Sequence, residues 1–201
     1  MVQPRVTFSA TVTANPSPAR PPKVEIFVDG SNFNLALHQE RIAFGVAVNL
    51  LATRLSRGYH FAKLRDYTSP LPDVNSPAYR RQQKFFDELR RSGRIELVLG
   101  RHEPRWDRSG RRYHVEKETD VNLAVDMVIG AYENRFDVAM LVAGDTDYVR
   151  AVRAVQSRGK RVTWCHLPAQ KHADQLAQIC DVQCELDEKF LRTCALGRRT
   201  D

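Results

Sequence analysis

The stretch DVAMLVAGDTDYVR, residues 137–150, joins an apolar run to two aspartates. Residues 138–143 carry no polar side chain, which is typical of a strand that is buried on both faces of a parallel sheet. Asp145 and Asp147 follow directly, where such a strand ends. Two carboxylates this close to a buried strand need a positive partner to stay ionised. We therefore expect a central strand here, with an acidic site at its end.

The segments around this stretch alternate between two patterns. Short runs rich in apolar and β-branched residues predict strands, and longer segments with helical spacing predict helices between them. The predicted strands are 23–30, 60–68, 94–100, 137–145 and 160–167, and the predicted helices are 31–57, 77–92, 119–134 and 147–157. This alternation predicts an α/β fold, in which a three-layer, Rossmann-like arrangement places helices on both faces of a mostly parallel sheet.

Length and composition indicate one domain. The 201 residues, 42% of them hydrophobic, are enough for a single sizeable core. Residues 1–22 are rich in Pro, Ser and Ala and are expected to form a flexible tail, followed by a domain over 23–190 and a C-terminal tail over 191–201. No apolar run approaches the roughly 18 residues of a membrane span. We expect a soluble cytoplasmic protein, and the sequence leaves open whether it forms a homodimer.

The cysteines favour neither a disulfide nor a zinc site. The chain has four of them, without a C-x-x-C pair and without an export signal. Free thiols in a reducing compartment are therefore the better interpretation. His166 and His172 lack the ligand spacing of a zinc ribbon or finger.

Four aspartates are expected to meet at one edge of the sheet. Asp29 ends the first predicted strand and Asp145 ends the fourth, and in an open parallel sheet these ends line the ligand site. Asp120 begins the helix 119–134, and Asp147 begins the helix after Asp145. Oxygen-only ligands suit Mg²⁺ or Mn²⁺, which activates water and offsets charge in phosphodiester hydrolysis. Each acid alone has an ordinary explanation as a turn former, a helix cap or a helix-dipole partner, so the prediction depends on their joint placement.

A basic segment, RHEPRWDRSGRRYHVEKE at 101–118, interrupts the alternation. Pro104 and Gly110 argue against regular structure, so we expect an exposed loop or a loose hairpin. Aromatic rings interleaved with cations are typical of binding to single-stranded nucleic acid, and the net charge of +7 favours a polyanionic partner. Trp106 could instead fold back onto the core. The candidate RNA contacts are Arg101, Arg105, Trp106, Arg111, Arg112, Tyr113 and Lys117.

Three motifs resemble the NYN domains of the LabA-like group, within the PIN-like nuclease superfamily. They are VEIFVDGSNFN, EKETDVNLAVDMV and VAMLVAGDTDYVRAVRAVQSRGKRV, and with LAQICDVQCELD the resemblance spans residues 23–187. It implies a PIN-like fold, metal-dependent RNA cleavage and a metal site formed by Asp29, Asp120, Asp145 and Asp147. It also implies that Asn32 supports the end of the first strand or touches substrate. Ala143 and Tyr148 stand where the family usually has Ser and Phe.

Two other functions are compatible with parts of this pattern. The motif GDTD and a strand-ending Asp29 also resemble phosphatases of the haloacid dehalogenase type, whose chemistry needs a second acid two residues after the nucleophile. That position is Ser31. A non-catalytic RNA-binding or adaptor module on the nuclease fold is the other alternative.

Overall fold

The computed structural model describes residues 20–170 and 172–196, and it has a six-stranded sheet in the order β3-β2-β1-β6-β7-β8. Every neighbouring pair in this sheet is parallel. The strands are β1 (Lys23–Asp29), β2 (His60–Thr68), β3 (Ile95–Leu99), β6 (Val138–Val142), β7 (Arg161–His166) and β8 (Val182–Glu185).

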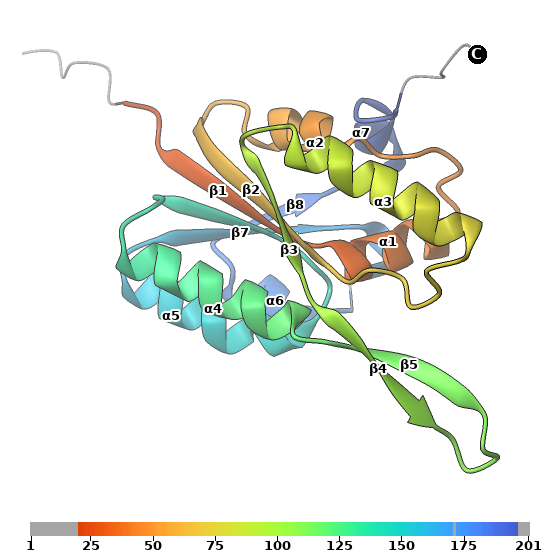
Figure 1. Ribbon diagram of the computed structural model, residues 1–201. Coiled ribbons are helices and arrows are strands. Elements are labelled where there is room, and N and C mark those ends of the chain that lie inside the picture. Colours follow the sequence, from red (N-terminus) through yellow and green to blue (C-terminus); the bar gives the residue numbers. More distant parts are fainter. Residues whose placement is uncertain (1–19, 171, 197–201) are drawn as a thin grey trace, which may run out of the picture.

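Helices cover both faces of the sheet (Figure 1). One layer contains α1 (Gly30–Gln39), α2 (Val48–Leu55), α3 (Pro77–Arg90) and α7 (Glu188–Arg192). The other contains α4 (Thr119–Tyr132), α5 (Val149–Ser157) and α6 (Asp174–Ile179). Two 3₁₀ turns, η1 (Thr146–Tyr148) and η2 (Pro168–Gln170), follow β6 and β7. The predicted three-layer α/β fold is confirmed.

The two central strands are apolar because both of their faces are covered. β1 and β6 pair from Val24 with Val138 to Val28 with Val142. Successive side chains point to opposite faces. Ile26 and Val28 therefore pack in one core with α1, α2 and α3, whereas Phe27 packs in the other with α4 and α5. All five residues of β6 are buried.

Three details differ from the predictions. The predicted helix 31–57 is wrong, because α1 ends at Gln39, Arg41 has a positive φ of 55°, and α2 begins only at Val48. In α4, the helical spacing of Val121, Val125 and Val128 indicated an apolar stripe, but Leu123 and Met127 face the core, while Val121 and Val125 are exposed. The chain also adds β8 to the sheet, next to β7.

The basic segment forms a hairpin, one of its two expected forms, but its strands are regular, which Pro104 and Gly110 argued against. β4 (Arg101–Trp106) pairs antiparallel with β5 (Arg112–Lys117), and this two-stranded sheet projects from the domain (Figure 1). Pro104 is tolerated because both strands of a two-stranded ribbon are edge strands. In the turn, Asp107 Oδ1 accepts hydrogen bonds from the backbone N–H groups of Ser109 and Arg111.

The packed part of the chain extends beyond residue 190. Leu191 and Cys194 are buried, and Ala195 forms a β-bridge with Val46. Residues 1–19 of the predicted N-terminal tail and residues 197–201 lie outside the described part of the chain. The four cysteines are free thiols. In the described ranges, none of the helices has both the length and the apolar surface that a bilayer span requires.

Candidate active site

Asp29 lies at the carboxyl end of β1 and has two hydrogen-bond partners. Its Oδ1 accepts from the backbone N–H of Asn32 (3.0 Å), which makes it the N-cap of α1, and its Oδ2 accepts from the Tyr148 hydroxyl (2.9 Å). The residue is only 3% exposed. Burial raises the pKa of Asp29 to about 6, and the negative charges of Asp120 and Glu116 contribute to the rise. The N-cap and the acidic site therefore use different oxygens of the same carboxylate.

Tyr148 joins Asp29 to Asp120. Its hydroxyl lies 2.9 Å from Asp29 Oδ2 and 3.1 Å from Asp120 Oδ1, so one O–H proton serves two carboxylates. Asp120 is the second residue of α4, and its pKa is raised by burial and by the neighbouring acids. Like charges at this range disfavour full ionisation of both groups. The charged side chains that shift the pKa of these two groups are all acids, so a positive charge would stabilise this part of the site.

Asp145 and Asp147 complete the acidic cluster after β6. Asp145 Oδ1 accepts from the backbone N–H of Asp147 at 2.9 Å and caps η1, as its local sequence also predicts. The charges of both aspartates contribute to the raised pKa of Asp120. Asp120 thus lies within electrostatic reach of each of the other three predicted acids.

The arrangement fits a hydrated dication better than a closed metal cage. Within residues 20–170 and 172–196, no three acids, histidines or cysteines are close enough to enclose an ion by themselves. Mg²⁺ often keeps several waters and uses only one or two protein carboxylates. The shared Tyr148 proton and the raised pKa of Asp29 both indicate a site that a positive charge would stabilise.

Asn32 connects α1, the segment after β6 and η2 by hydrogen bonds beside the acids. Its Oδ1 accepts from the backbone N–H of Gly144 (2.8 Å) and from Nε2 of Gln170 (2.5 Å). Gly144 precedes Asp145, so the bond positions the end of β6 against α1. The Asn32 side chain therefore supports the end of β6, whereas the resemblance implied support for the end of the first strand; at β1 the Asn32 hydrogen bond to Asp29 comes from its backbone N–H. Gln170 has no distinguishing signal in the sequence.

Glu116 is a fifth acid that the sequence prediction did not include. It lies on β5, its Oε1 accepts from Ser31 Oγ at 2.9 Å, and its charge contributes to the raised pKa of both Asp29 and Asp120. Its position four residues before Asp120 was the available signal. The hairpin is therefore attached to the acidic site through Glu116. Asp126, by contrast, lies away from the acids and accepts from the Tyr67 hydroxyl at 2.9 Å.

The predicted RNA contacts divide between two faces of the hairpin. Residues directly opposite each other in an antiparallel pair share a face, so the register separates them. The Trp106 face contains His102, Pro104, Trp106, Arg112, His114 and Glu116, and the Tyr113 face contains Arg101, Glu103, Arg105, Tyr113, Val115 and Lys117. Only the Trp106 face leads to Glu116 and hence to the acids. Arg111 precedes β5 in the turn.

Trp106 is 61% exposed and Tyr113 47%, so neither ring folds back onto the core. Arg101 and Arg105 pair with Glu103 on the Tyr113 face, and Arg101 also pairs with Glu118. Arg111 pairs with Asp107 in the turn. Lys117 is exposed at the base of the hairpin, opposite Arg101. The arginines of the Tyr113 face are thus partly neutralised.

Comparison with known proteins gives the family. The NYN domain family matches residues 23–187, which is most of the chain. The chain belongs to the NYN domain family. NYN domains are PIN-like nuclease domains, and the described sheet and helix layers are consistent with this family.

A solved structure shares the fold of this NYN domain. A protein of unknown function from Vibrio parahaemolyticus is 23% identical with a TM-score of 0.65, and the match covers 87% of this chain and 99% of that chain. At this identity the likeness shows the fold alone. A possible 1-phosphofructokinase from Thermotoga maritima is 13% identical with a TM-score of 0.36, covering 82% of this chain and 57% of that one, too weak a likeness for any inference. No curated protein matches the chain.

Proposed function

We propose that this NYN domain is a metal-dependent ribonuclease of the LabA-like group, which hydrolyses phosphodiester bonds of RNA with Mg²⁺ or Mn²⁺. The observation that carries the proposal is the single Tyr148 proton shared by Asp29 and Asp120. Asp145 and Asp147 add two charges nearby. Such a cluster favours a small dication, because carboxylate oxygens are its preferred ligands.

Asp29, Asp120, Asp145 and Asp147 are the residues that would hold the ion. When bound, the ion supplies an activated water and offsets the charge that develops on the phosphate. The chain's own contribution is positional: Asn32 holds the end of β6, and Tyr148 holds Asp29 and Asp120 in fixed orientations. Glu116 adds negative potential from the hairpin side.

RNA binding by the Trp106 face gives the substrate a path to the acids. A groove of about 370 Å³ runs between this face and the loop that carries Pro70 and Pro72. His102, His114 and Arg112 line it, and the exposed Trp106 lies on the same face near the turn. Cations for phosphates and a flat ring for a base are what single-stranded RNA requires.

The test is cleavage of end-labelled RNAs, structured and unstructured, in Mg²⁺, Mn²⁺ or EDTA by the wild type and Asp145→Asn. We expect cleavage that requires the metal and falls by at least about 100-fold in the variant, since each lost ligand weakens stabilisation of the transition state. A binding module without catalysis would instead bind the RNAs, cut none of them in any metal, and keep or gain affinity when Asp145 loses its charge.

A further inference from the structure

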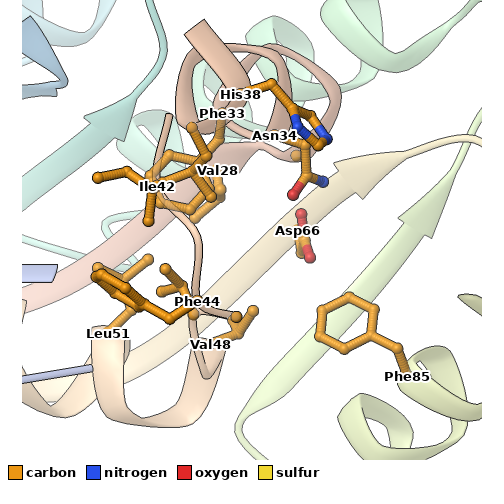
Figure 2. Close-up of a pocket in the computed structure, with 14 residues that line it drawn as sticks. Val28, Phe33, Asn34, His38, Ile42, Phe44, Val48, Leu51, Asp66 and Phe85 are labelled. Carbon is orange, nitrogen blue, oxygen red and sulfur yellow. The ribbon is translucent and has the colours of Figure 1, made fainter. Parts of the chain in front are cut away.

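A second pocket lies on the other face of the sheet from Tyr148 and the acidic cluster. It has a volume of about 200 Å³ and is enclosed by α1, the segment 42–46, α2, α3 and the strands β1 and β2. Most of its lining is apolar and includes the rings of Phe33, Phe44 and Phe85. Figure 2 shows Asp66 in the middle of these residues, with Asn34 and His38 of α1 on one side and Phe85 of α3 on the other.

Asp66 is a buried acid whose charge is not compensated. It is 4% exposed, and its Oδ1 is buried without a hydrogen-bond partner. Burial raises the pKa of Asp66 to about 7, and the charge of Asp29 adds to the rise. A buried polar group without a partner costs stability. A bound molecule that donates a hydrogen bond to the carboxyl group from the pocket side would offset part of that cost.

The backbone is built to accommodate this side chain. Asp66 pairs with Val28 on β1, so its side chain points to the face that α1 and α3 cover. A Cβ atom at Gly30 would lie 2.4 Å from Asp66 Oδ1 and 3.1 Å from the Tyr67 carbonyl oxygen. Only glycine allows this approach, so the start of α1 leaves room for the carboxyl group.

The lining defines the chemistry of the ligand. A neutral flat ring with N–H donors matches both the carboxyl group and the apolar wall of the pocket. Side-chain recognition of an extruded nucleobase uses this combination of edge hydrogen bonds and apolar or aromatic contacts. A cavity of about 200 Å³ suits one ring system rather than a larger ligand.

We propose that this pocket binds a nucleobase through N–H donation to Asp66, and that guanine is the preferred base. Guanine offers N1–H and an exocyclic amine on one edge, whereas adenine offers only its amine. Asn34 and His38 stand on α1 at the polar side of the pocket. The base can belong to a free nucleoside or to an RNA strand. The second case rests on the proposed ribonuclease function. It is consistent with the short distance between the two sites, since the charge of Asp29 contributes to the raised pKa of Asp66.

The first experiment is calorimetric titration of the full chain with guanosine, inosine, adenosine and spermidine in EDTA, so that the acidic site plays no part. We expect guanosine to bind at least about tenfold more tightly than inosine, which lacks the exocyclic amine, or adenosine. Asp66→Asn should lose at least about tenfold in guanosine affinity. Asp87→Asn, an exposed acid on α3, is the matched control and should bind as the wild type does.

A second experiment separates the two sources of the base. An oligoadenylate with one guanosine, or with one inosine in its place, is titrated into wild type and Asp66→Asn in EDTA. If the wild type binds the guanosine oligonucleotide more tightly than the inosine one and Asp66→Asn does not, the pocket binds a base within RNA. If Asp66→Asn weakens binding of free guanosine but of neither oligonucleotide, the pocket binds a free nucleoside. Any of three results would overturn the proposal. They are unchanged guanosine affinity in folded Asp66→Asn, no guanosine binding at millimolar concentration, and tighter binding of spermidine than of guanosine. Metal-dependent cleavage of oligoadenylate tests the ribonuclease independently.

Discussion

Ser31 Oγ donates a hydrogen bond of 2.9 Å to Glu116 Oε1, and this bond ties the first turn of α1 to the second strand of the hairpin. Ser31 belongs to the motif that follows Asp29, and Glu116 belongs to the arm proposed to carry RNA. The contact therefore connects the proposed RNA-binding face of the hairpin to the acidic cluster. The negative charge of Glu116 also acts on Asp29 and Asp120.

Glu116→Gln separates these two effects, because glutamine keeps an oxygen that can accept from Ser31 but removes the charge. We expect the Mn²⁺ concentration for half-maximal cleavage to rise about fivefold, since one nearby charge contributes on the order of 1 kcal/mol. RNA affinity in EDTA should stay within about twofold. Glu103→Gln, on the Tyr113 face, is the control and should change neither quantity. A loss of RNA affinity with unchanged metal dependence would contradict the assigned role of Glu116.

Asp29→Asn should stabilise the metal-free protein while it abolishes cleavage. The folded-state pKa of Asp29 is about 6 against an ordinary value of 3.8, so the folded protein holds this proton more tightly than the unfolded chain. Stability that depends on this proton is present below pH 4 and is lost as the pH rises through 6. The loss is up to about 3 kcal/mol.

Asparagine cannot titrate, so the stability gap between Asp29→Asn and wild type should be largest above pH 6 and should shrink toward pH 4. Urea unfolding in EDTA at pH 4, 5, 6 and 8 measures it. Equal gaps at all four pH values would show that the buried charge of Asp29 is not its source.

Tyr148→Phe tests whether the hydroxyl substitutes for a missing cation. The variant keeps the buried ring and should fold. Without metal it should lose about 1–3 kcal/mol at pH 8, because hydrogen bonds to charged groups contribute about this much. Saturating Mn²⁺ should reduce the loss. Tyr67→Phe is the control, since the Tyr67 hydroxyl donates to Asp126 outside the acidic cluster, and its loss should be independent of Mn²⁺.

Trp106→Ala and Tyr113→Ala form a matched pair on opposite faces of the hairpin. We expect Trp106→Ala to weaken binding of single-stranded RNA by about 5- to 100-fold, the range of one lost stacking contact. Tyr113→Ala should weaken it by less than about threefold. Fluorescence anisotropy with labelled RNA in EDTA measures both. Equal losses would mean that RNA wraps both faces and does not follow the Trp106 face alone.

The sequence predicted the parts of the fold that local pattern determines. A continuous apolar run such as 138–142 is compatible with few environments, and a central parallel strand is one of them. Because parallel strands end at one edge, the sequence predicted Asp29 and Asp145 at the same edge if their strands are neighbours, and β1 and β6 are indeed paired.

The sequence did not predict details that depend on packing between elements. In α4, spacing alone fits Val121 and Val125 as well as Leu123 and Met127, and only contact with the sheet determines which pair is buried. The break between α1 and α2 contains Ile42 and Phe44, which are apolar and continue the helical pattern, although they pack against the core as part of a connecting segment. Glu116 and Asp66 gain their significance from neighbours distant in sequence. Asp66 lies outside the recognised motifs, and Glu116, although it begins the motif EKETDVNLAVDMV, depends for its role on the distant Ser31 and Asp29.

The hairpin leaves the domain and returns to it at one place, since Arg101 pairs with Lys117 at its base. A Cβ atom at Gly100 would lie 2.4 Å from the Lys117 carbonyl oxygen and 2.8 Å from Thr119, so the base is closely packed while the strands beyond it project outward. The hairpin can thus be altered separately from the rest of the domain. Replacing residues 103–115 would leave the His102–Glu116 pair and the contact with Ser31 in place, and it would change the proposed RNA-binding surface without redesigning the core.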